Sequence, residues 1–213
     1  MHVLTLALVA CAAALYAAGA RRRHSYAHIG SFVAGIAVLA VAALAPMHAF
    51  LWTHMVQHEL LMVVAAPLIV LGRPLHAVPL RLPRWLHDPL LAWSAHAAAL
   101  WLWHAPPFFE AALARESLHF AQHASFVASA LLFWWTVLGP RARSLVGVLS
   151  LFTTMLHTGA LGALMTFSRH AWYAGYGLED QQLAGLVMWI PAGLAYPAAA
   201  LFIGSRWLRR SAA

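Results

Sequence analysis

Residues 54–66 read HMVQHELLMVVAA, two histidines and a glutamate followed directly by an apolar run. In a helix His54 and His58 are four residues apart, so their side chains share one face, which Met62 continues one turn further. The apolar run is typical of a helix buried in a membrane, where an ionisable side chain is costly and by default serves a function. This stretch therefore predicts a membrane helix with a functional site inside it.

The composition extends this interpretation to the whole chain. Of its 213 residues, 63% are hydrophobic and 9% are charged, whereas a soluble domain carries about 25% charged residues. No long polar block separates the apolar segments, so we expect a single transmembrane domain over residues 1–213. The basic residues are all arginines in short loops, where arginines orient a membrane chain. Nucleic-acid binding is therefore not the explanation of the positive net charge.

Seven apolar segments predict helices that cross a membrane, and Pro67 predicts a kink in the third of them. The segments are residues 3–19, 30–45, 50–71, 89–104, 118–138, 145–167 and 183–204. The expected fold class is all-α, an integral membrane bundle of seven transmembrane helices. Seven helices would also suit a retinal protein, but the retinal Schiff base needs a lysine and the sequence contains none.

The arginines predict the orientation of the bundle. One face collects the loops after the first, third and fifth segments and the C-terminal tail. It holds Arg21, Arg22, Arg23, Arg73, Arg81, Arg84, Arg141, Arg143, Arg206, Arg209 and Arg210. The opposite face has only Arg115 and Arg169, together with four acidic residues. By the positive-inside rule, the N-terminus lies outside and the C-terminus inside.

A second histidine pair repeats the spacing of the first. His119 and His123 begin the segment 118–138, and His104 ends the segment 89–104. At about 1.5 Å per helical residue, these histidines and the first pair all fall in the outer half of the membrane. Two such pairs on facing helices can build a metal site in the core of a bundle. The predicted metal ligands are His54, His58, His104, His119 and His123.

Weaker candidates for the same histidine cluster are His157, Met55, Met62 and Glu59. His157 lies roughly 15 Å below the outer surface, and Glu59 could orient a ligand or carry a proton. The single cysteine, Cys11, cannot pair with a second one, so thiolate chemistry is excluded. Histidine with thioether suits copper, as Cu(I) or Cu(II), and histidine alone suits copper or zinc, with zinc as the second choice.

The other histidines have simpler interpretations. We expect interfacial or loop positions for His24, His28, His76 and His87, and water-exposed outer positions for His2, His48 and His170. His48 could assist metal uptake. His96 lies at another depth and is expected to be a packing residue. Met155, Met165 and Met188 are expected to fill the core.

Several motifs between roughly residues 30 and 195 are shared with a known family. They are HMVQH at 54–58 with its apolar run to Pro67, GRP at 72–74, WHAP at 103–106, His119 to His123 with FWW at 133–135, and DQQLAGLVMWIP at 180–191. On these motifs the chain resembles the CtaG-type cytochrome c oxidase assembly factors of bacteria. The resemblance implies a multi-pass protein of the bacterial inner (plasma) membrane. It also implies a role in handling copper for the buried copper centre of subunit I of a haem-copper oxidase, with a periplasmic copper donor as a further partner.

The favoured hypothesis is a non-enzymatic metallochaperone that accepts copper from outside and releases it laterally to an oxidase subunit. A haem-binding or electron-transfer protein is an alternative, although histidines four apart face one side and fit a compact ion better than haem. A copper or proton transporter would need polar residues down to the inner face, and the sequence offers few: Ser94, Ser129, Thr136 and Ser150. A metal-dependent membrane enzyme is a further alternative, for which no substrate-pocket signal is found.

Overall fold

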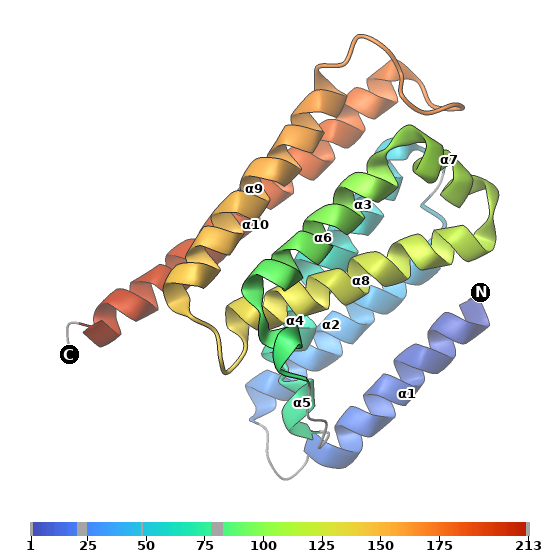
Figure 1. The fold of residues 1–213 in the computed structure, drawn as a ribbon. Coiled ribbons are helices and arrows are strands. Elements are labelled where there is room, and N and C mark those ends of the chain that lie inside the picture. The colour runs from blue at the N-terminus through green and yellow to red at the C-terminus, as the bar shows by residue number, and fades with distance from the viewer. Residues whose placement is uncertain (1, 21–24, 48, 78–82, 212–213) are drawn as a thin grey trace.

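Helices joined by turns and loops make up the part of the protein that the structure describes, as Figure 1 shows. The structure is a computed structural model, which describes residues 2–20, 25–47, 49–77 and 83–211. No strand occurs within these ranges. This confirms the predicted all-α class.

A helix occupies each of the apolar segments. The long helices are α1 (His2–Ala20), α2 (Tyr26–Leu44), the continuous series α3 (Leu51–Glu59), η1 (Leu60–Ala65) and α4 (Ala66–Leu71), α6 (Pro89–His104), α8 (Glu116–Leu138), α9 (Ser144–Thr166) and α10 (Leu178–Ser211). Short helices α5 (Pro74–Ala77), η2 (Arg84–His87) and α7 (Pro106–Ala114) lie in the connections. The sequence analysis did not predict α7, although Pro106 and Pro107 are typical of a first helical turn.

Five helices in the described ranges are long and apolar enough to cross a membrane. They are Tyr26–Leu44, Leu51–Leu71, Glu116–Leu138, Ser144–Thr166 and Leu178–Arg209. Within the residues whose side chains are described, the apolar part of α1 is Ala7–Gly19, but the helix itself has 19 residues, as many as α2. α6 has 16 residues. A helix of that length rises about 24 Å, less than the roughly 30 Å hydrocarbon core of a bilayer. The count of seven spans and their orientation therefore stay predictions.

Pro67 changes the helix type rather than simply bending the helix. Leu60–Ala65 forms a π-helix, and the Ala66 N–H donates to the Leu61 carbonyl five residues earlier. Proline has no N–H, and its ring clashes with the carbonyl of the residue four positions before it, here Val63. A wider turn relieves that clash, and such π segments are frequent at functional sites. The π-helix begins directly after Glu59, at the end of the predicted site.

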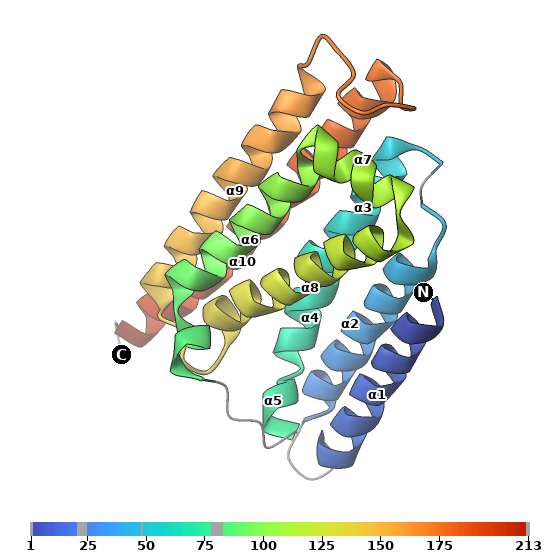
Figure 2. The same cartoon turned by 45° about the vertical axis from the view of Figure 1, so that its right-hand side comes forward.

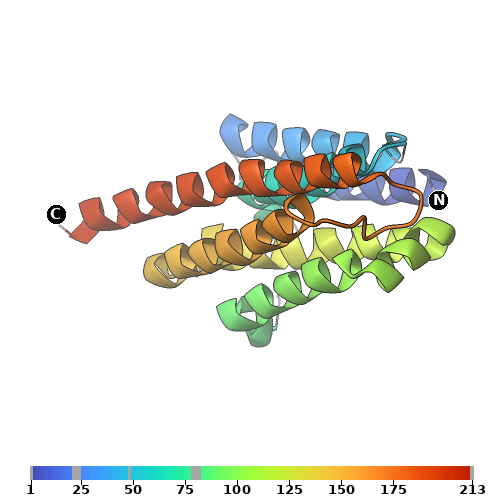
Figure 3. The same ribbon diagram turned by 90° about the horizontal axis from the view of Figure 1, so that it is seen from above.

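The helices form an elongated bundle in which α9 and α10 run side by side (Figures 1 and 2). α10 also packs on α3, and α8 packs on both α6 and α4, while α1 lies at the periphery against α2 and α5. Figure 3 shows that the start of α1 and the end of α10 point to opposite ends of the bundle. The segment α3–α4 is therefore enclosed by helices on several sides.

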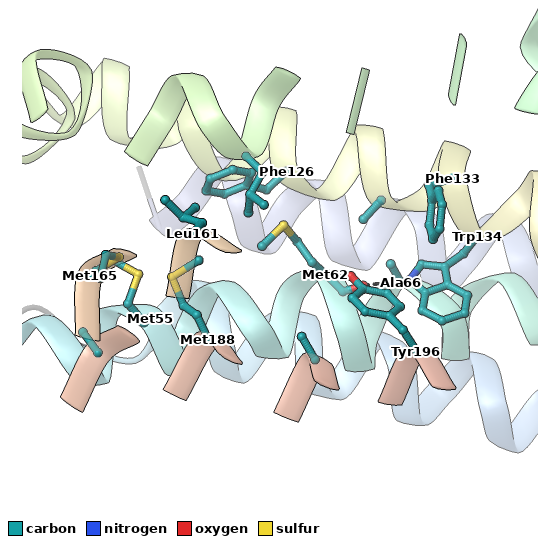
Figure 4. Close-up of a cluster of buried hydrophobic side chains, with 14 of the residues drawn as sticks. Met55, Met62, Ala66, Phe126, Phe133, Trp134, Leu161, Met165, Met188 and Tyr196 are labelled. Atoms are coloured by element: carbon teal, nitrogen blue, oxygen red, sulfur yellow. Dashed lines mark hydrogen bonds between the residues drawn. The ribbon is translucent and has the colours of Figure 1, made fainter. Parts of the chain in front are cut away.

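The rotation of α3 about its axis follows from the contacts of two side chains, Met55 and Gln57. Met55 points into the apolar core, where Figure 4 shows it with Met165 of α9 and Met188 of α10. The Gln57 amide donates to the Ala42 carbonyl of α2. These contacts direct two faces of α3 toward α2, α9 and α10. The remaining face, which carries His54 and His58, is turned toward α6 and α8.

Two anchors fix the position of the same segment. The Asp180 carboxylate of α10 accepts hydrogen bonds from the backbone N–H groups of Leu51 and Trp52, at 2.9 and 3.0 Å. At the other end, the Trp134 indole of α8 donates to the Met62 carbonyl at 2.9 Å. Because the first N–H groups of a helix have no partner within the helix, Asp180 acts as a cap supplied by another element.

Candidate metal centre

α3, α6 and α8 bring the five predicted ligands into one cluster, called here the five-histidine cluster. His58 lies at its centre, with ring centroids 4.5 Å from His54, 5.4 Å from His104 and 5.3 Å from His123. His119 completes it, 4.1 Å from His123 and 5.6 Å from His54. His54, His58 and His104 are at most 1% exposed, and the other two are partly buried. The five histidines that the i, i+4 spacing and the estimated depths grouped together therefore lie close to one another in the structure.

Three of these histidines satisfy the distances of a metal site. One ring nitrogen each from His54, His58 and His123 lies within 4.8 Å of the other two. Two nitrogens bonded to one ion at about 2.0–2.1 Å lie at most about 4.2 Å apart. Small side-chain rotations would therefore close these three imidazoles on an ion.

His104 presents a nitrogen lone pair to the cluster. Its Nδ1 lies 2.7 Å from the Leu100 carbonyl oxygen. A carbonyl can only accept, so Nδ1 carries the proton and Nε2 is left with the lone pair. Nε2 is buried and has no hydrogen-bond partner among the described residues. Metal-binding histidines characteristically donate their other N–H to a carbonyl in this way, which fixes the tautomer and the ring orientation.

His58 likewise has buried ring nitrogens that could bind an ion. Both of its ring nitrogens are buried, and neither has a hydrogen-bond partner within the ranges that the structure covers. A buried polar group without a partner costs roughly 1–3 kcal/mol, so native structures rarely keep one without a reason. A bound ion would accept one lone pair from His58 and the Nε2 lone pair of His104. The residues present therefore fit a metal with imidazole ligands.

Aromatic side chains and a folded-back segment cover the cluster at the end of the bundle where α6 and α9 end, which the arginines predict to face outside. Phe109 of α7 lies against His54, with centroids 5.2 Å apart, and Tyr173 packs on Phe109 at 4.3 Å. The Tyr173 hydroxyl donates to the His104 carbonyl at 2.7 Å. Burial raises the pKa of Tyr173, so this hydroxyl stays protonated and able to donate. We call α7 and residues 167–177 together the outer cover.

Two polar residues hold the outer cover in place. The buried Gln181 accepts from the Trp172 N–H and donates to the Met165 and His170 carbonyls. Glu110 of α7 accepts from the Ala174 N–H at 2.9 Å. The sequence analysis missed this cover, although a glutamine at the start of an apolar segment was a signal for it, since such an amide needs internal partners.

The cluster is closed below and open on one side. The ring of Phe126 lies beneath it, 4.7 Å from His58 and 5.8 Å from His104. Toward α1 and α2, an apolar cavity of about 800 Å³ reaches His119 and His123. We call it the lateral cavity. Its walls are mostly apolar, with Glu116, His119 and His123 among the lining residues.

The four weaker candidates of the sequence analysis have different neighbours from the five-histidine cluster. Glu59 is buried and lies close enough to Tyr196 of α10 to interact with it electrostatically. Met55 and Met62 belong to the apolar core (Figure 4). His157 packs against Trp93 at 5.6 Å, and in the described residues no ring contact joins it to the five-histidine cluster. Whether any of them serves a metal stays a prediction.

The remaining histidines are distributed as follows. His87 contacts Trp135 at 3.1 Å and Arg141 at 2.9 Å in a connection between helices, as expected for a loop position. His170 is exposed, and His28 is partly buried near the start of α2. His96 is 1% exposed, and its ring contacts the Ser129 hydroxyl. The sequence analysis interpreted His96 as a packing residue and did not predict this contact. The side chains of His2, His24, His48 and His76 lie outside the described part.

Fold and site together define a class: an all-helical protein with several candidate membrane spans and a buried histidine cluster able to accept a metal ion. The family model described as cytochrome c oxidase caa3 assembly factor (Caa3_CtaG) matches residues 10–210. The chain therefore belongs to this family of assembly factors, which confirms the resemblance found in its motifs. A search of curated proteins and a search of solved structures each gave no match.

Proposed function

We propose that this protein is a membrane metallochaperone that carries copper during the assembly of a haem-copper cytochrome c oxidase. The cargo ion is bound by His54, His58, His104, His119 and His123, and the protein itself performs no catalysis. The observation that carries the proposal is the His104 tautomer, which leaves a buried lone pair on Nε2 beside the unpartnered nitrogens of His58. Membership of an assembly-factor family supplies the biological setting.

The donor set favours Cu(I) among the ions considered. All five donors are imidazoles, which suit copper and zinc, and none is a carboxylate that would offset added charge. The cost of moving an ion out of water rises with the square of its charge, so a monovalent ion is the easiest to hold in a buried neutral site. Neutral imidazoles also release an ion more readily than thiolates, as a carrier requires. Zinc remains the second choice.

The surroundings of the cluster support a lateral route of release. The outer cover lies over the outer side, Phe126 closes the inner side, and the partly buried pair His119 and His123 borders the lateral cavity. A client helix of oxidase subunit I approaching through the bilayer would meet this pair first. In this proposal the chain crosses the bacterial inner membrane seven times, with its N-terminus outside. A periplasmic donor would then deliver copper near the outer cover.

Metal analysis of purified full-length protein tests the proposal. We expect near-stoichiometric copper in the wild type, a large loss in His58→Ala and in His123→Ala, and no change in His170→Ala, an exposed histidine outside the site. In cells, the first two variants should lower the copper content of the oxidase and the third should not. Undiminished copper in both cluster variants would refute the shared site. A Soret band in the purified protein would favour the haem hypothesis instead.

A further inference from the structure

His96 of α6 and His157 of α9 are two further histidines with buried ring nitrogens, on helices that pack against each other. The His96 ring stacks on Phe133 of α8, with centroids 5.4 Å apart. His96 lies eight residues before His104 on α6, about 12 Å deeper along the helix, and His157 lies nine residues before the end of α9, about 14 Å deep. Both residues therefore lie well inside their helices. α6 packs directly on α9, and the contact of His157 with Trp93 places it beside the turn of α6 that precedes His96.

The tautomer of His96 leaves its Nε2 as a free lone pair. Nδ1 of His96 lies 3.2 Å from the Ser129 hydroxyl. That hydroxyl also lies 3.2 Å from the Phe126 carbonyl, to which it donates, and we therefore assign the ring proton of His96 to Nδ1. Nε2 is buried without a hydrogen-bond partner in the described part of the chain. This is the arrangement found at His104, with a serine in place of the carbonyl.

His157 offers the second donor atom. Both of its ring nitrogens are buried and without hydrogen-bond partners among the residues covered by the structure. Its ring stands edge-on to the Trp93 ring with centroids 5.6 Å apart, and His96 lies three residues after Trp93, on the same face of α6. Ionisable side chains at such depth are expensive, and those that occur face a partner or a pathway. Packing against Trp93 does not satisfy the His157 nitrogens.

We propose that His96 and His157 bind one Cu(I) ion as a second, deeper site, separate from the five-histidine cluster. The ion would be held by two neutral imidazoles, a low coordination number that Cu(I) accepts and that zinc, with its preference for four ligands, does not. Phe126 separates the two sites, because its ring contacts His58 and His104 while its carbonyl holds Ser129. The identity of the ion rests on the proposed copper function, whereas the existence of the site rests on the two side chains.

Anaerobic titration with Cu(I) alone, against a competing chromogenic Cu(I) chelator, tests this inference on the purified full-length protein. We expect two ions in the wild type and in His170→Ala, and one ion in His96→Asn and in His157→Ala. Asparagine keeps an N–H donor near the position of Nδ1 for Ser129 and lacks Nε2, so His96→Asn removes the donor atom with little disturbance of packing. Should His157→Ala fail to give a monodisperse helical protein, His96→Asn alone decides.

The variant His58→Ala separates this inference from the proposed function. With both correct, His58→Ala keeps the deeper ion, and the double variant His58→Ala/His96→Asn binds none. One ion in the wild type that His96→Asn loses and His58→Ala keeps would support the deeper site and refute the five-histidine site. Wild-type stoichiometry and wild-type affinity in both His96→Asn and His157→Ala would overturn the deeper site and leave the proposed function standing.

Discussion

At the scale of single residues, the Leu100 carbonyl decides which nitrogen of His104 faces the cluster. We predict that His104→Asn, which keeps a donor for that carbonyl and removes Nε2, lowers Cu(I) affinity about tenfold or more, the factor that a loss of about 1.4 kcal/mol produces. Chelator competition measures it. The matched control is His170→Asn, the same substitution at an exposed histidine, which should leave the affinity unchanged. Equal affinities in the two variants would remove His104 from the ligand set.

Tyr173 gives a second prediction at this scale. Tyr173→Phe removes the hydroxyl that donates to the His104 carbonyl, and the free energy of unfolding should fall by about 1 kcal/mol. Burial raises the pKa of Tyr173 above its ordinary value of 10.0. The unfolded chain therefore loses this proton first, and wild-type stability should fall as the pH rises above about 10.

Thermal unfolding of the purified protein at pH 7 and at pH 11 measures both effects of Tyr173→Phe. The variant should be less stable than the wild type at pH 7, and it should lose less stability between the two pH values. Tyr26→Phe serves as the control, because Tyr26 is 94% exposed. A pH dependence identical in Tyr173→Phe and the wild type would show that this hydroxyl is not buried in the folded protein.

At the scale of elements, α3 depends on a cap from α10. Asp180→Ala leaves the N–H groups of Leu51 and Trp52 without their acceptor, and we predict a loss of about 0.5–2 kcal/mol of stability, the usual cost of losing an N-cap. Hydrogen exchange in the first turn of α3 should become faster. Because α3 carries His54 and His58, Cu(I) affinity should fall as well.

Glu179→Ala is the matched control for Asp180→Ala. Glu179 is the adjacent acidic residue in the first turn of α10 and is exposed. It should change neither the melting temperature nor the exchange of α3 appreciably. If both substitutions had the same effect, the charge at the start of α10 would explain the result rather than the specific cap on α3.

The elements also show how far the sequence could predict this protein. The long helices were predictable because each is a continuous apolar run, and the five-histidine cluster was predictable because spacing and depth together place side chains on facing helices. The partnership of His96 with Ser129 was not, because it depends on the register between α6 and α8. Likewise, the contact of Tyr173 with Phe109 requires two connections to fold back over the bundle. The spacing of residues along the sequence does not predict such folding.

At the scale of the whole molecule, the direction of the chain in the membrane decides whether the five-histidine cluster faces the copper supply. The distribution of arginines predicts an outer N-terminus and an inner C-terminus. Figure 3 is compatible with this, since α1 starts and α10 ends at opposite ends of the bundle. The helices α1 and α6, which are not among the five candidate spans in the described residues, are the critical elements. An odd number of crossings requires both of them to span or both to stay on one side.

Reporter fusions test this topology. We predict fluorescence from green fluorescent protein fused after Ala213 and from an insertion at Arg141. We predict alkaline phosphatase activity from fusions at Ala45 and at Gly175, on the opposite face. A fusion at Ala45 that reports the inner side, together with an N-terminal tag that is accessible from outside, would show that α1 does not cross, because α2 alone then separates that site from the N-terminus. The outer position of the cluster depends on Gly175 instead: an inner location there would turn the outer cover toward the cytoplasm, and copper would have to arrive from that side.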